Sequence, residues 1–143
     1  MGTQQLEEEI LRLNEKINEN KKKIDDLKKQ IIKIDKYKKD VDNMFNNCKT
    51  EYNWMKIEDA SVPIENVINY NRDMNEAIES TVNWIGDEKN KINELNEAII
   101  KELNDQIVDL EQNNIDLGAL IKEKEEELRH VVEEITRQNS IQE

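Results

Sequence analysis

Apolar residues recur at alternating steps of four and three along the first part of the chain. The series begins at Leu6 and ends at Met55, and only Asn20 and Lys38 interrupt it. A repeat of this kind places its members on one stripe of an α-helix, and an apolar stripe of this length needs a partner helix to cover it. The pattern therefore predicts a first long helix over residues 1–56 that packs against another helix.

The strongest break in this pattern comes at Pro63. Proline disfavours helical geometry at the residue before it, and Ser61 or Asp59 can cap the helix that follows. We therefore expect a turn at residues 57–62, a second long helix at residues 63–137 and a disordered tail at residues 138–143. We expect a kink in the second helix near Gly86 or within residues 99–110, where the apolar spacing contains an eleven-residue step.

Folding the two helices back at this turn predicts which residues face each other. Residues whose numbers add up to 119 are expected to pair, so that Phe45 lies opposite Met74 and Leu27 lies opposite Ile92. Charge favours the same pairing, because residues 21–39 carry a net charge of +6 and residues 80–98 a net charge of −2. The expected fold is all-α: a long antiparallel coiled-coil helical hairpin with a C-terminal helical overhang.

The overhang is the part of the second helix that this pairing leaves uncovered. Leu6 would pair near residue 113, so the apolar stripe that follows would lack a partner within the chain. Its members are Leu117, Ile121, Leu128, Val131 and Ile135. Exposed apolar stripes mark association sites, so we expect residues 117–135 to bind a second copy or another helical protein.

Composition narrows the classes of function. The 143 residues carry a formal charge of −12, and residues 60–143 account for all of it, with 8 bases against 20 acids. This acidic balance argues against a nucleic-acid partner and favours a basic partner surface. No apolar run is longer than three residues, which excludes insertion into a membrane, and the N-terminus lacks the features of a secretory leader. We therefore expect a cytoplasmic protein, or one secreted by a leaderless route.

Candidate catalytic and metal-binding residues have simpler explanations. His130 stands alone beside the apolar stripe, and Cys48 lies on the stripe without an activating neighbour. Cys48 is also the only cysteine, which excludes a disulfide within the chain. Asn20, Asn71 and Asn114 lie on the stripe, where buried amides commonly set helix register. No phosphate-binding loop or nucleophile motif is present. We therefore expect no enzymatic activity, no cofactor and no metal.

Trp84-Ile85-Gly86 is the one short motif that suggests recognition. Trp84 lies beside the stripe residue Ile85, where it can either cover a neighbouring helix or contact a partner, and both interpretations remain open. Gly86 is costly inside a helix, since glycine is about 1 kcal/mol less favourable there than alanine.

A small acidic helical hairpin that carries Trp-any-Gly at Trp84-Ile85-Gly86 resembles the WXG superfamily of type VII (ESX-like) secretion substrates. Within that superfamily it looks most like the helical partner proteins of LXG-domain toxins in low-GC Gram-positive bacteria. The resemblance implies an adaptor that binds the helical export domain of a secreted toxin and presents it to the secretion machine, with Trp84 and Gly86 carrying the recognition. The C-terminal export signal Tyr-any-any-any-Asp or Glu is absent, because Tyr70 is the last tyrosine and the residue four positions after it is Met74. The partner would then have to supply this signal.

The alternative is a structural role. A coiled-coil spacer or tether, or a fragment of a longer filamentous protein, would have the same composition and the same apolar stripe. Trp84 would then be incidental to function.

Overall fold

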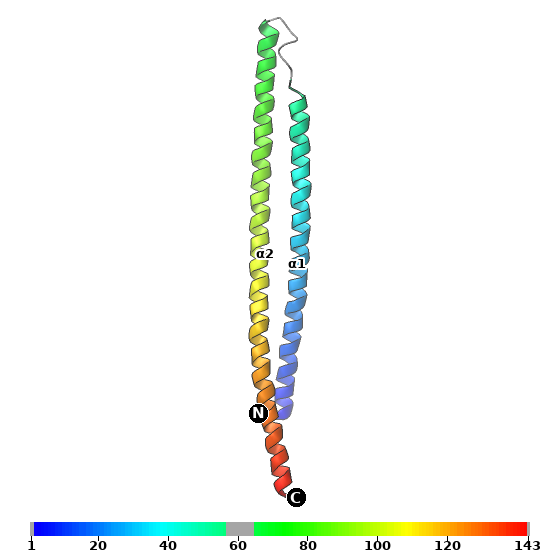
Figure 1. Ribbon diagram of the computed structural model, residues 1–143, viewed down its shortest axis with the longest axis vertical. Helices are drawn as coiled ribbons and strands as arrows, with labels where there is room; N and C mark the ends of the chain where they lie inside the picture. Colours follow the sequence, from blue (N-terminus) through cyan, green and yellow to red (C-terminus); the bar gives the residue numbers. More distant parts are fainter. Residues whose placement is uncertain (1, 57–64, 143) are drawn as a thin grey trace. The chain divides into compact units, whose positions relative to one another are not determined.

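The described part of the chain folds into two helices. The computed structural model describes residues 2–56 and 65–142, and in the second range the side chains from Asn69 onward. Helix α1 is Thr3–Trp54 and helix α2 is Glu65–Gln142, and there is no strand within the described residues (Figure 1). The predicted all-α helical hairpin is confirmed.

The ends of α1 follow from its backbone hydrogen bonds. The N–H of Leu6 donates to the carbonyl oxygen of Gly2 at 3.2 Å, which closes the first turn. At the other end, Met55 and Lys56 donate to the carbonyls of Tyr52 and Asn53, and these tighter bonds between residues three apart satisfy carbonyls that a helix end leaves unpaired. Helix α1 contains neither glycine nor proline, so nothing in its sequence interrupts it.

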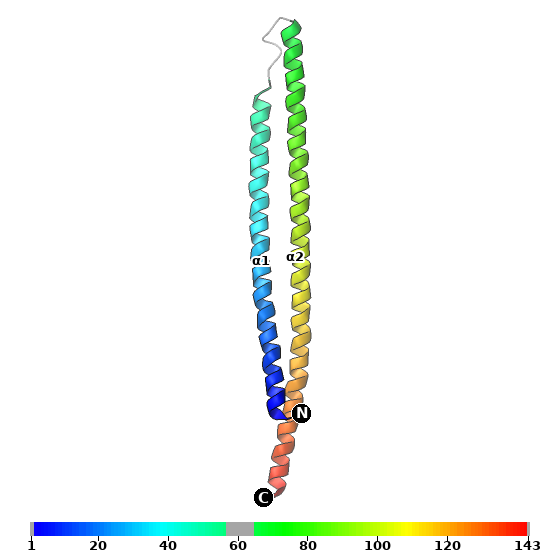
Figure 2. The ribbon, with the colours of Figure 1, turned by 180° about the vertical axis from the view of Figure 1, so that it is seen from behind.

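The chain divides into two compact units, each with one segment of each helix. Unit 1 consists of Met1–Gln30 and Glu102–Glu143, and unit 2 consists of Ile31–Lys101. In each unit the segments of α1 and α2 lie side by side and antiparallel, as both views show (Figure 1, Figure 2).

Polar contacts define which residues face each other in unit 1. Asn20, which is 1% exposed, donates from Nδ2 to the Oδ1 atoms of Asn113 and Asn114, at 2.8 Å each. Lys124 Nζ lies 2.6 Å from Glu9 Oε2. The buried apolar residues around these contacts are Leu6, Ile24, Leu103, Ile107 and Ile121.

Unit 2 has a similar arrangement of contacts. Asn93 Nδ2 donates to Asp42 Oδ1 at 2.8 Å, and Lys38 Nζ lies 3.3 Å from Glu97 Oε1. The buried apolar residues are Val41, Ile78, Val82 and Ile85.

These contacts correct the predicted register. Facing residue numbers add up to 133 or 134 in unit 1 and to 135 in unit 2, instead of 119. Leu27 accordingly shares a groove with Gln106 and Leu110 and does not lie opposite Ile92. The predicted pairing of Phe45 with Met74 is wrong for the same reason.

The polar residues explain why this register is preferred. An apolar stripe that repeats every seven residues matches its partner almost equally well after a shift of two repeats, so the stripe alone does not select one register. In the expected register Asn20 would face Ile99 and its buried amide would lack a hydrogen-bond partner, which costs about 1–3 kcal/mol. In the observed register Asn20 is satisfied by two amide oxygens, and Glu9 and Lys124 form an ion pair.

The expected element boundaries are also partly corrected. Helix α2 continues to Gln142, so the expected disordered tail is wrong for residues 138–142, where a regular helix is found. Helix α2 also passes through Gly86 and residues 99–110 without a break, and Gly86 has no positive φ. The expected turn at residues 57–62 and the expected helix start at Pro63 lie outside the described residues.

Candidate protein docking surface

The two residues of the predicted recognition motif point in different directions. Trp84 is 61% exposed, whereas Gly86 is half-buried and faces α1. A Cβ added to Gly86 would lie 3.9 Å from Lys49 Nζ. Residues two apart on an α-helix are separated by about 200° around its axis, so the structure does not bring Trp84 and Gly86 together in one site.

The predicted association site at residues 117–135 is largely covered within the chain. Ile121 is buried, and Leu117, Leu128 and Val131 are half-buried, whereas Ile135 is 46% exposed. The expectation that all five lack an intramolecular partner is therefore wrong. The reason is the register, which places the first turns of α1 beside this part of α2.

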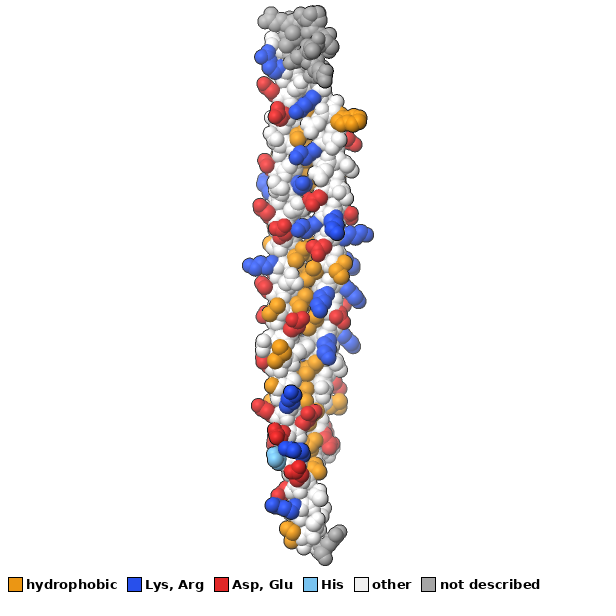
Figure 3. Space-filling model, viewed as in Figure 1, with side chains coloured by type: hydrophobic (Ala, Val, Ile, Leu, Met, Phe, Trp, Pro, Cys, Tyr) orange, Lys and Arg blue, Asp and Glu red, His pale blue; other side chains and the backbone are white. Residues whose placement is uncertain are grey.

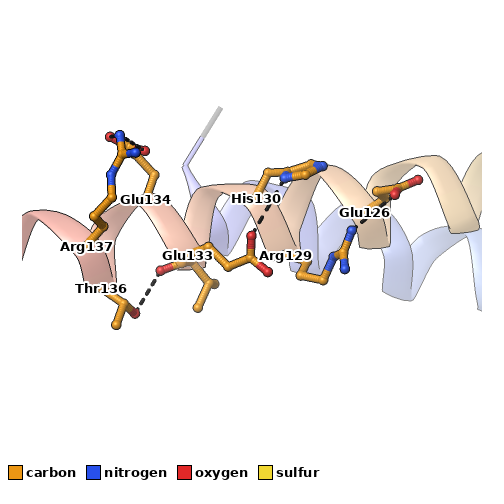
Figure 4. Close-up of polar contacts among 8 residues, drawn as sticks. Glu126, Arg129, His130, Glu133, Glu134, Thr136 and Arg137 are labelled. Carbon is orange, nitrogen blue, oxygen red and sulfur yellow. Dashed lines mark hydrogen bonds and ion pairs between the residues drawn. The ribbon is translucent and has the colours of Figure 1, made fainter.

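A shorter overhang remains beyond the N-terminus of α1. In unit 1 the final turns of α2 extend past the start of α1 and leave Val132, Ile135 and Ile141 exposed (Figure 2). Side chains within the last turns of α2 form ion pairs and hydrogen bonds with one another (Figure 4). Arg137 pairs with Glu134 at 2.8 Å, and the Thr136 hydroxyl donates to the Val132 carbonyl at 2.9 Å.

Unit 2 carries a larger apolar surface that the sequence pattern did not separate from the core. We call it the apolar flank and define it by eight exposed side chains from both helices. They are Tyr37, Met44 and Met55 on the α1 side and Tyr70, Met74, Trp84, Leu95 and Ile99 on α2. Figure 3 shows one face of the molecule, on which hydrophobic side chains remain uncovered among charged ones.

Helix geometry places these side chains on one side of the hairpin in unit 2. Asp42 and Asn93 bond to each other across one flank. Met44 and Leu95 each follow a member of that pair by two residues, so both point to the opposite flank. The other members lie four, seven, eleven, twenty-one or twenty-five residues from Met44 or Leu95, which are close to whole numbers of turns.

A rotation of α2 explains why this flank is apolar. The sequence pattern placed Met74, Thr81 and Leu95 on the stripe that faces α1. The structure instead buries Val82 and Asn96, which are one residue further along, and leaves Leu95 65% exposed. Met74 and Leu95 were thus identified as apolar from the sequence, but they were assigned to the surface that faces α1.

This rotation also places amides in the helix interface. Asn71 and Asn96 are 4% and 8% exposed, and their Nδ2 atoms have no hydrogen-bond partner among the described residues. Buried unpaired donors destabilise a fold, which indicates that the interface in unit 2 is not optimised for the isolated chain.

The residues with reactive side chains are dispersed. Cys48 is half-buried in unit 2, and His130 is exposed in unit 1, 3.8 Å from Glu133 (Figure 4). Among the described residues no cluster of three or more His, Cys, Asp or Glu side chains is placed to hold a metal ion. The pKa of Lys124 is raised above 10.5, chiefly because its ammonium group donates a hydrogen bond to Glu9.

No protein-family model, curated protein or solved structure matches this chain. Neither described helix contains a segment that is long and apolar enough to cross a membrane. The apolar flank gathers eight of the exposed large hydrophobic side chains of the described residues on one side of unit 2.

Proposed function

We propose that this protein is a non-enzymatic helical adaptor that binds the helical export domain of a secreted toxin and presents it to a type VII secretion system. The observation that carries the proposal is the apolar flank of unit 2, with Trp84 at its centre. The resemblance of Trp84-Ile85-Gly86 to the WXG motif supports the choice of secretion system.

The composition of the flank favours binding to a protein. Its eight large side chains together expose on the order of 1,000 Å² of mainly apolar surface, which is comparable to the area that one partner contributes to a specific interface. Tryptophan, tyrosine and methionine dominate it, and these residues are enriched in protein interfaces and their energetic hot spots.

The shape of the flank favours a helical partner. The side chains follow two antiparallel helix segments and form a strip that spans Tyr70 to Ile99 on α2, about 44 Å at a rise of 1.5 Å per residue. An amphipathic helix laid along such a strip buries one face in the way that helices bind grooves in other complexes. The partner would also provide the export signal that this chain lacks.

The adaptor is tested with Trp84→Ala and a control, Ile32→Ala. Ile32 is 68% exposed, against 61% for Trp84, and it lies off the apolar flank, because five residues separate it from Tyr37 and place it about 140° away around α1. We expect Trp84→Ala to raise the Kd for the toxin export domain by about 30-fold, which corresponds to the loss of one hot-spot residue of about 2 kcal/mol. Ile32→Ala should leave the Kd unchanged, and both variants should keep their helix content and melting temperature.

Export provides the second readout. In the bacterium that encodes the chain, Trp84→Ala should stop secretion of the toxin without lowering its level inside the cell. An unchanged Kd and unchanged secretion would contradict the adaptor and favour the structural spacer.

A further inference from the structure

We infer that a second copy of the chain covers the apolar flank when no other partner is bound, with α1 of each copy lying on α2 of the other. This dimer rests on the same surface as the proposed function, because the second copy and the toxin export domain would both bind the apolar flank. A helical partner would therefore bind by displacing the second copy.

The contacts in unit 2 give the height of each residue along the helices. The pairs Lys38 with Glu97, Asp42 with Asn93 and Lys49 with Gly86 each add up to 135. A residue of α2 is therefore level with the α1 residue whose number completes this sum. Leu95 is level with residue 40, and Trp84 is level with residue 51.

The apolar residues of the two helices lie at matching heights. Leu95 is level with residue 40 of α1, so it lies between Tyr37, three residues before that level, and Met44, four residues after it. Trp84 is level with residue 51, and Met55 lies four residues beyond that level. A two-fold axis parallel to the helices keeps every height unchanged and places α1 of one copy over α2 of the other. Leu95 then lies between Tyr37 and Met44 of the second copy, and Trp84 lies beside its Met55, so the apolar side chains cover each other.

Charged residues at the edge of the flank fit the same arrangement. Asp40 and Lys91 precede Asp42 and Asn93 by two residues, which places them at the outer edges of the flank on α1 and α2. Lys91 is level with residue 44, about 6 Å along the axis from Asp40. Within one copy Lys91 pairs with Glu88 at 3.2 Å, and in the proposed dimer it also lies close to Asp40 of the other copy, which gives two equivalent ion pairs between the copies.

The size of the surface is sufficient for a stable dimer. A specific interface buries about 800 Å² on each partner, and the flank exposes on the order of 1,000 Å². In the proposed dimer, residues 31–101 of the two copies together form a four-helix arrangement in which each helix has antiparallel neighbours, as in common helical bundles. A dimer would remove from water the side chains that unit 2 leaves exposed.

The test is sedimentation equilibrium of the wild-type chain and of three variants. The wild type should be a dimer, and Leu95→Glu should raise its dissociation constant by at least about 30-fold, as expected when a buried hot-spot residue becomes charged. Ile32→Glu and Ile135→Glu change exposed apolar residues outside the flank, in unit 2 and in the overhang, and should leave the dimer intact. Circular dichroism should give the same helix content for all four.

Charge exchange tests the geometry. Lys91→Asp and Asp40→Lys should each weaken the dimer, and the variant that combines them should restore it, because the exchanged charges again meet between copies. A wild-type monomer would overturn the inference. So would dissociation by Ile135→Glu with Leu95→Glu unaffected, or a combined variant that is weaker than both single variants. A monomer would leave the proposed adaptor intact, since Trp84→Ala tests it separately.

Discussion

Two buried asparagines offer a direct test of how polar groups stabilise this fold. Asn20 and Asn96 both lie in the helix interface, at 1% and 8% exposure. Asn20 donates two hydrogen bonds across the interface, whereas Asn96 Nδ2 has no partner among the described residues. The same substitution to leucine should therefore have opposite effects at the two positions.

The magnitudes follow from these contacts. Asn20→Leu removes two hydrogen bonds at about 1 kcal/mol each, so it should lower the free energy of unfolding by about 2 kcal/mol. Asn96→Leu removes an unpaired buried donor, whose cost is about 1–3 kcal/mol, so it should raise the free energy of unfolding by about that amount. The two variants should differ by roughly 3–5 kcal/mol.

Urea denaturation followed by circular dichroism at 222 nm measures both values, with near-ultraviolet absorbance as a second probe of a two-state transition. Equal changes at the two positions would refute the reasoning, because the substitutions differ mainly in whether the amide is satisfied. Destabilisation by Asn96→Leu alone would show that its Nδ2 has a partner in solution.

Three further predictions concern stability. Gly118→Ala should raise the free energy of unfolding by about 0.5–1 kcal/mol in urea denaturation, because a Cβ there meets nothing within 4 Å and glycine disfavours helix, and a loss of stability would show that the position is crowded. Leu6→Ala should cost about 2–5 kcal/mol in the same assay, since Leu6 is fully buried, and a change below 1 kcal/mol would place the N-terminus of α1 away from α2. Lys124→Met should lower stability at neutral pH, and the difference from wild type should shrink as the pH rises above 10.5. The raised pKa of Lys124 means that its contribution is complete below the unfolded value and is lost through the higher folded value, so a difference that stays constant up to pH 12 would contradict the ion pair with Glu9.

The apolar repeat was sufficient to predict the helices. The stripe from Leu6 to Met55 predicted α1 to within one or two residues, because a period of 3.5 has no alternative in strands or loops. Antiparallel pairing followed from the break at Pro63. These features depend on residues close in sequence, and local rules describe them well.

Register depends on contacts between residues about ninety positions apart, and the apolar repeat carries little information about it. The pairing that aligned Phe45 with Met74 satisfied the apolar stripe but left Asn20 without a partner. Giving the amides and charges priority over the apolar layers would have favoured the observed register, since Asn20 reaches two amides only there.

The apolar flank was missed because it depends on the rotation of α2. Leu95 satisfies the repeat in sequence as well as Ile92 does, and only the position of α1 shows that Asn96 is buried in its place. Trp84 was identified from its motif, but its neighbours on the flank are twenty or more residues away or on the other helix. A surface made of residues so distant from each other becomes visible only after the register is known.

We propose that another protein binds the apolar flank of unit 2, and site-specific photocrosslinking in cells that naturally produce the chain tests this proposal most directly. A photoreactive amino acid would replace Leu95 on the flank or, as the control, Ile32, which is equally exposed but lies off it. We expect position 95 to crosslink to a toxin export domain or to a second copy of the chain, and position 32 to give neither product. Absence of a product from position 95, or the same products in equal yield from position 32, would contradict the claim.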